Sequence, residues 1–172
     1  MRAIALMPLI VLAACSGAEA DQKADTSNLK MEAGQWEAAS EVISVDSLDK
    51  TPPAIKTAVG DKATEIDCLA TADVAKPQPA LFVGADAGEC TYESFYMSRG
   101  RLNATLGCER KDVEGDIQVS LEGSYTATSY DVTARTQTYL PGPGDVAIGR
   151  KVAGKKVAAQ CAAPDPKAAP KA

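Results

Sequence analysis

Apolar and polar residues alternate along much of the chain between residues 35 and 161, a pattern typical of strands with one face in a core. The cleanest alternation is in residues 117–125, whose odd-numbered positions we expect to face that core. A second run, residues 35–45, loses its phase near Ala39, which indicates a β-bulge. Further strands are predicted at residues 64–69, 90–97, 101–108, 130–139, 146–150 and 155–161.

Short segments rich in proline, glycine and small polar residues separate these strands. Residues 51–60 begin with Thr-Pro-Pro and end in glycine, which predicts a short helix. Thr71 is a candidate N-cap for a single helical turn that Pro77 ends. Residues 141–144, Pro-Gly-Pro-Gly, must interrupt any strand. The expected fold is mainly β, an antiparallel sheet of about six to eight strands in a half-open barrel or sandwich, with one or two short helices.

Four cysteines, an even number, lie within this region and predict two disulfides if the chain folds in an oxidising compartment. Residues 98–100, Ser-Arg-Gly, form a predicted three-residue hairpin loop whose glycine accepts a positive φ. Folding the flanking strands about Arg99 sets Cys90 opposite Cys108. By elimination, Cys68 pairs with Cys161.

The same hairpin register predicts which side chains share a face, because alternate residues of a strand point to opposite sides. The register also places both cysteines of the hairpin on the apolar face, so two independent patterns agree. The predicted core-facing residues are Cys90, Tyr92, Tyr96, Leu102, Ala104, Leu106 and Cys108. The opposite face receives Thr91, Glu93, Arg101, Asn103 and Thr105.

The N-terminal residues predict where the protein resides. Arg2 precedes a short apolar run, residues 3–12, which is typical of a secretory signal and too short for the roughly 20 apolar residues of a membrane span. Leu12-Ala13-Ala14-Cys15 resembles a bacterial lipobox. The resemblance implies a diacylglyceryl group on the Cys15 sulfur, cleavage before it, and an added acyl chain such as palmitate, which together anchor a protein stably. Ser16 replaces the Asp of an inner-membrane retention signal, so we expect the periplasmic face of the outer membrane.

Composition divides the chain into a folded domain with polar extensions. A length of 172 residues with 45% hydrophobic content is sufficient for one domain with a real core. Residues just after Cys15, and those after Cys161, hold too few apolar side chains to order themselves. The predicted organisation is a signal peptide at 1–14, a lipidated flexible tether at 15–30, a disulfide-stapled β-domain at 31–161 and a disordered Ala/Pro/Lys tail at 162–172.

Charge and composition exclude several functions. A net charge of −5 and an aromatic content of 5% give neither attraction nor a stacking platform for nucleic acid. The chain has no histidine, so a Ser-His or Cys-His nucleophile is unavailable, and no metal site or cofactor is expected. The carboxylate pairs Asp112 with Glu114 and Asp86 with Glu89 lie in turn-like stretches, where solvated acids are usual. We therefore predict that the protein is not an enzyme.

Positive charge concentrates near the end of the domain, at Arg150, Lys151, Lys155 and Lys156. One interpretation is that these lysines prevent strand edges from pairing with other chains. The alternative is contact with an anionic partner, either lipid phosphates or a cell-wall polymer.

The order of these landmarks resembles a family of exported bacterial proteins, often lipoproteins, that carry a domain of unknown function. The resemblance covers about residues 31–161. It rests on residues 32–37 (Glu-Ala-Gly-Gln-Trp-Glu), Cys68-Leu69-Ala70-Thr71, the Cys90 to Cys108 hairpin, and Gly154-Lys155-Lys156-Val157 ahead of Cys161. The resemblance implies the β topology and two disulfides, and it implies no activity.

Two functions are predicted from these features. The first is a membrane-anchored, non-enzymatic binding or structural module of the envelope, whose partner is an envelope protein or cell-wall polymer. The alternative is a carrier or sensor of a small apolar ligand or lipid, with Trp36, Tyr92 and Tyr96 inside a curved sheet.

Overall fold

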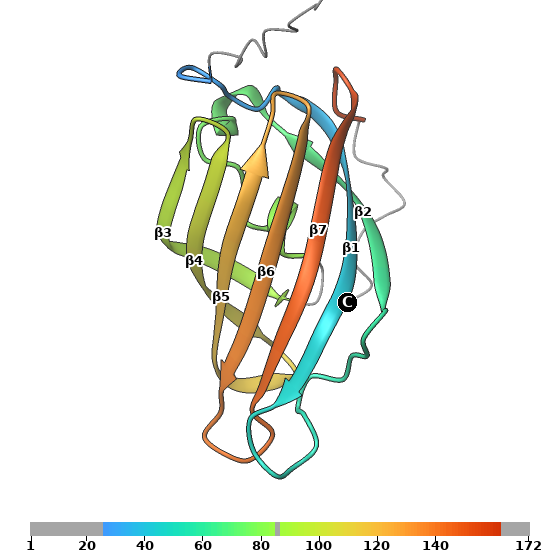
Figure 1. The fold of residues 1–172 in the computed structure, drawn as a ribbon, viewed down its shortest axis with the longest axis vertical. Coiled ribbons are helices and arrows are strands. Elements are labelled where there is room, and N and C mark those ends of the chain that lie inside the picture. The colour runs from blue at the N-terminus through green and yellow to red at the C-terminus, as the bar shows by residue number, and fades with distance from the viewer. Residues whose placement is uncertain (1–25, 85–86, 163–172) are drawn as a thin grey trace, which may run out of the picture.

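A computed structural model describes residues 26–84 and 87–162 of the chain. It contains a single open sheet of seven antiparallel strands in the order β2-β1-β7-β6-β5-β4-β3, which curves as seen in Figure 1. The predicted mainly-β class is therefore confirmed. The strands are β1 (Gly34–Ser47), β2 (Lys62–Leu69), β3 (Glu89–Ser98), β4 (Arg101–Arg110), β5 (Val113–Tyr125), β6 (Ser129–Tyr139) and β7 (Val146–Ala158).

The segment that joins the two edge strands crosses one face of the sheet, and we call this side the core face and the other the open face (Figure 1). The segment holds a 3-10 turn, η1 (Thr71–Asp73), and a short helix, α1 (Ala80–Val83). Three consecutive residues of α1, Leu81, Phe82 and Val83, are 0–4% exposed. The inner side of the curved sheet is thus filled by the protein's own side chains.

An aromatic cluster joins this segment to the sheet. Trp36 of β1 stacks on Tyr130 of β6 with ring centroids 5.8 Å apart, and Phe82 forms a T-shaped pair with Tyr130 with ring centroids 5.0 Å apart. The Tyr130 hydroxyl donates a hydrogen bond to the backbone carbonyl of Leu81. Gly154 lies opposite Tyr130 on β7, and the tyrosine ring occupies the space that a Cβ there would need.

The hairpin of β3 and β4 confirms the cysteine pairing and corrects the predicted loop. Cys90 lies opposite Cys108, and the two form a disulfide with Cα atoms 4.0 Å apart. The turn contains two residues, Arg99 (φ 52°) and Gly100 (φ 76°), because positive φ at both positions suits the right-handed strand twist. The register shifts by one between Tyr92 and Ser94, where a bulge absorbs the difference.

This bulge changes which side chains of β3 face the core. Beyond it, Phe95 pairs with Ala104 and Met97 with Leu102, so Phe95 and Met97 pack on the core. Tyr96 is 54% exposed on the open face. The prediction that Tyr96 faces the core is therefore wrong, whereas the predicted burial of Leu102, Leu106 and Cys108 is confirmed.

Other strand predictions hold with changed boundaries. The odd-numbered positions of residues 117–125 face the core, as predicted. The bulge predicted near Ala39 lies instead between Val42 and Ser44, since residues 36–42 keep a strict alternation of burial in which Ser40 takes an inward position. The two strands predicted at 146–150 and 155–161 form one strand, β7, because its residues pair continuously with both β1 and β6.

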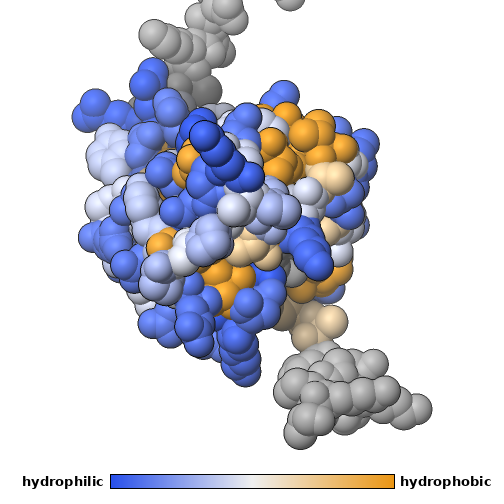
Figure 2. All heavy atoms as spheres, turned by 90° about the horizontal axis from the view of Figure 1, so that it is seen from below, coloured by the Kyte–Doolittle hydropathy of each residue, from blue (hydrophilic) through white to orange (hydrophobic). Residues whose placement is uncertain are grey.

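Residues 51–60 do not form the predicted helix. The Asp49 carboxylate instead binds the backbone amide of Thr51 at 2.7 Å and that of Gly144 at 2.6 Å. It thereby ties the loop after β1 to the loop before β7, and competes with helical hydrogen bonding. These loops lie at one end of the sheet, where apolar residues form separate patches among polar ones (Figure 2).

The second disulfide joins Cys68 at the end of β2 to Cys161 beyond β7, with Cα atoms 5.4 Å apart, as predicted. The helices in the described part of the chain are far shorter than the roughly 20 apolar residues that a membrane span needs. The predicted signal peptide, Cys15, residues 16–25 of the predicted tether and residues 163–172 of the predicted tail lie outside the described residues.

Candidate binding face

Hollows in the protein surface lie on the open face of the sheet. One of about 560 Å³ extends over β3 to β6, and a second of about 510 Å³ extends over β4 to β7. The two share Asn103, Glu122 and Thr133, and we call them together the open-face groove. A further hollow of about 750 Å³ adjoins them toward the Cys90–Cys108 disulfide.

The strand register explains how the groove is built. One row across the strands places Asn103, Glu122, Thr133 and Lys151 opposite one another, and the next row places Thr105, Ser120 and Arg135 together. Successive outward positions on β4, β5 and β6 are therefore small hydroxyls or polar side chains. Small side chains leave room above the backbone, so this part of the face is hollowed.

The charges of the groove are arranged differently from those beside it. Toward β1 and β2, the cations are ion-paired, since Lys155 lies 2.8 Å from Glu37 and Lys62 lies 3.4 Å from Glu41. In the groove, Arg101, Arg135 and Lys151 make no ion pair with any described residue. Their guanidinium and ammonium groups remain available for hydrogen bonds to a ligand.

Carboxylates nevertheless lie near these cations. Glu122 is opposite Thr133, so Arg135 occupies a diagonal position on β6, at a typical distance of about 7–8 Å between such neighbours. Asp131 is opposite Ala153 and stands in the same diagonal relation to Lys151. The groove therefore has alternating charges and little net potential.

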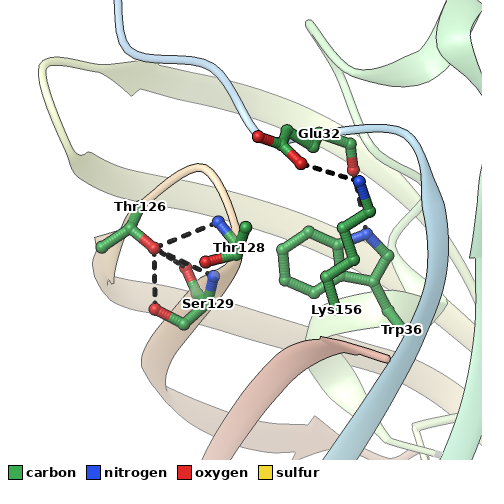
Figure 3. A network of polar contacts seen from close by, with 6 residues as sticks. All are labelled: Glu32, Trp36, Thr126, Thr128, Ser129 and Lys156. Atoms are coloured by element: carbon green, nitrogen blue, oxygen red, sulfur yellow. Dashed lines mark hydrogen bonds and ion pairs between the residues drawn. The ribbon is translucent and has the colours of Figure 1, made fainter. Parts of the chain in front are cut away.

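The structure divides the four cations that the sequence grouped together. Lys151 and Lys155 are exposed on the open face, whereas Arg150 is 7% exposed on the core face, with Nη1 3.4 Å from the Ser40 hydroxyl. Lys156 forms an ion pair with Glu32 at 2.7 Å, beside the Trp36 ring (Figure 3). The four residues therefore do not form one surface, and contact with an anionic partner remains a prediction for Lys151 and Lys155.

The close-up also shows the hydrogen bonds made around Trp36 and in the turn between β5 and β6. Trp36 donates its indole N–H to the Glu32 carbonyl at 3.1 Å, so the residue that pairs with Lys156 also orients the indole (Figure 3). In the turn between β5 and β6, the Thr126 hydroxyl accepts the amides of Thr128 and Ser129. These contacts satisfy local polar groups and have a structural role.

The three aromatic residues proposed to line a ligand cavity lie in different places. Trp36 is fully buried in the aromatic cluster. The Tyr92 hydroxyl donates a hydrogen bond of 2.9 Å to the Pro77 carbonyl, and the Lys76 ammonium lies over the Tyr92 ring. Burial raises the pKa of the Tyr92 phenol. Tyr96 borders the open-face groove instead. They do not enclose one cavity.

The candidate acid pairs have ordinary surroundings where the structure describes them. Asp112 forms an ion pair with Arg110 at 2.7 Å, and the hydrogen bond from Arg110 lowers the pKa of Asp112. Asp86 lies outside the described residues. Asp67, which the sequence did not single out, has a pKa raised by burial and one oxygen without a partner in the described part of the chain. Nor does that part contain a group of three ligand-type side chains that could hold a metal ion.

The fold and the disulfides define a class of protein: an open, curved antiparallel sheet with two cross-links and one polar, hollowed face. Within this class, the chain belongs to the family described as "Protein of unknown function (DUF3617)", whose model matches residues 31–161. No curated protein and no solved structure matches the chain. The match has the same bounds as the domain predicted from the sequence.

Proposed function

We propose that the protein is an exported lipoprotein, anchored through Cys15 at the periplasmic face of the outer membrane, whose β-domain is a non-enzymatic binding or structural module. The cysteine distribution carries this proposal. Of five cysteines, four form two disulfides within the domain, and the fifth is Cys15 of the lipobox-like sequence. Disulfides form and persist outside the reducing cytosol, so the domain and the N-terminal motif favour the same destination.

The packing of the domain supports a role in binding through its surface. The core face is filled by α1 and the aromatic cluster, which leaves polar side chains on the open face for contact with a partner. Two disulfides hold this face in one shape, and one of them, Cys68–Cys161, joins residues that are 93 apart in the sequence. A fixed surface favours recognition of an envelope partner, because it lowers the entropy lost on binding.

Metabolic labelling with radioactive palmitate in a bacterial host tests the anchor. We expect the label on the full chain in the membrane fraction. The Cys15→Ser variant should lose the label and leave that fraction, since it lacks the sulfur that is alkylated. The double variant Cys68→Ser/Cys161→Ser is the matched control, because it removes two other cysteines and should keep its label. An unlabelled wild-type chain, or a label that persists in Cys15→Ser, overturns the proposal.

A further inference from the structure

We infer that the open-face groove binds a glycan, an uncharged or weakly charged polyhydroxylated chain. This inference rests on the proposed function in so far as such a chain is an envelope partner. It names the ligand class that the module recognises and the residues that recognise it, chiefly Tyr96, Asn103 and Arg135.

The dimensions of the groove suit an elongated ligand. It extends from Tyr96 on β3 to Lys151 on β7, across the strand order β3-β4-β5-β6-β7. Neighbouring strands lie roughly 4.8 Å apart, so this path is about 19 Å long, which accommodates several linked sugar rings. A compact metabolite would leave most of the groove empty.

The side chains of the groove match the surface of a sugar. The hydroxyls of Thr105, Ser120 and Thr133 and the amide of Asn103 can both donate and accept, as sugar hydroxyls do. Arg135 donates in a planar fork and makes no ion pair with a described residue. Alternating donors and acceptors along the groove therefore suit a chain of hydroxyl groups.

Tyr96 supplies the apolar contact that such sites need. Its side chain is 54% exposed at the border of the groove because the bulge before Ser94 turns it to the open face. A phenol ring offers a flat apolar surface with a polar tip, on which the C–H face of a sugar ring can stack. The bulge thus places one aromatic platform beside a row of polar side chains.

Two other ligand classes fit less well. A polyanion would meet Glu122 and Asp131 beside the three cations, so it would gain little attraction. An extended peptide binds a sheet by pairing along an edge strand, but the groove crosses the face of the sheet, where β4 to β7 are each paired on both sides and only its border strand β3 is an edge. Recognition in the groove must therefore proceed through side chains.

A binding assay on the full chain, purified in detergent, tests the inference. The probes are immobilised chito-, cello-, malto- and xylo-oligosaccharides, with heparin and polygalacturonate as polyanions and an unstructured peptide as the third class. We expect retention on at least one neutral glycan that persists at high salt. Tyr96→Ala should weaken that binding about 2- to 10-fold, the contribution typical of an aromatic contact. Arg135→Ala should weaken it about 10-fold or more, since it removes charge-assisted hydrogen bonds.

Ile66→Ala is the matched control, because Ile66 is 53% exposed on the other edge strand, outside the groove, and its removal should change nothing. Retention on no neutral glycan, retention on polyanions or the peptide alone, or full binding by Tyr96→Ala and Arg135→Ala overturns the inference. The palmitate experiment stays separate: lost labelling with intact glycan binding rejects only the anchor, and intact labelling without glycan binding rejects only this inference.

Discussion

Replacing Phe82 by alanine should show whether α1 is part of the hydrophobic core. Phe82 is 0% exposed and forms a T-shaped pair with Tyr130, within the segment that crosses the core face. Truncation of a buried phenylalanine costs about 3–5 kcal/mol, which includes the cavity it leaves. We expect the free energy of unfolding to fall by about 4 kcal/mol, because the sheet behind Phe82 is hydrogen-bonded and cannot collapse into the space.

The protein carries its own probe for this measurement. Trp36 is the single tryptophan, is 0% exposed and stacks on the same Tyr130, so its fluorescence reports the unfolding of this cluster. With an m-value near 2 kcal/mol/M, the urea midpoint of Phe82→Ala should fall by about 2 M. Val59→Ala, at a position 64% exposed, is the control and should stay within about 0.5 kcal/mol of wild type. A loss below about 1 kcal/mol for Phe82→Ala would refute the assignment of α1 to the core.

Three further predictions concern the rest of the domain. Gly154→Ala should destabilise the domain by about 1–3 kcal/mol or more in thermal unfolding, because the alanine Cβ would overlap the Tyr130 ring. Gly142→Ala should be neutral, because a Cβ at residue 142 has no atom within 4 Å. Removing the Cys68–Cys161 disulfide should lower the free energy of unfolding by about 4–5 kcal/mol, and removing Cys90–Cys108 should lower it by about 3 kcal/mol, as measured by urea titration. The difference arises because the linked cysteines are 93 and 18 residues apart in the sequence. Equal losses would contradict an origin in loop entropy. Hydrogen bonds from Thr51 and Gly144 lower the pKa of Asp49 to about 2. The ionised Asp49 therefore stabilises the folded state fully above the unfolded pKa of about 3.9, and this stabilisation is lost as the pH falls toward 2. The melting temperatures of wild type and Asp49→Asn should therefore differ at pH 6 and converge near pH 2, and a constant gap would argue against this role.

Local sequence signals predicted the parts of the fold that depend on alternation and on paired cysteines. The odd-numbered core positions of β5 follow from periodicity alone. The disulfide pairing needed more than an even number of cysteines, because the hairpin register had to set Cys90 opposite Cys108 before Cys68 and Cys161 were left to pair. The position of a bulge does not, because it depends on how two strands meet. The bulges beside Glu93 and Ile43 are not marked by their own residues, and the first of them carried Tyr96 to the opposite face from the one predicted.

Tertiary contacts decided the remaining cases. Residues 51–60 contain helix signals, but the Asp49 carboxylate and the loop before β7 offer stronger partners than a short helix would. The reverse holds for α1, which forms a helix although its four residues carry no capping signal. Its helical turn packs Leu81, Phe82 and Val83 on the sheet. The open-face groove could not be predicted from the sequence because it also depends on tertiary pairing. Its row of Asn103, Glu122 and Thr133 comes from three strands, and the sequence does not determine their relative register.

The pairing of β1 with β7 has a consequence for how the chain reaches its native state. Among the described residues, the first and last strands are neighbours, so the sheet is complete only when the chain between them, residues 48–145, has found its place. Contacts so distant in sequence make folding slow. Until β7 arrives, one edge of β1 and one edge of β6 would present unsatisfied backbone groups, the kind of template on which chains aggregate. A chaperone that covers these edges until β7 is in place should therefore lower the aggregation of the refolding chain.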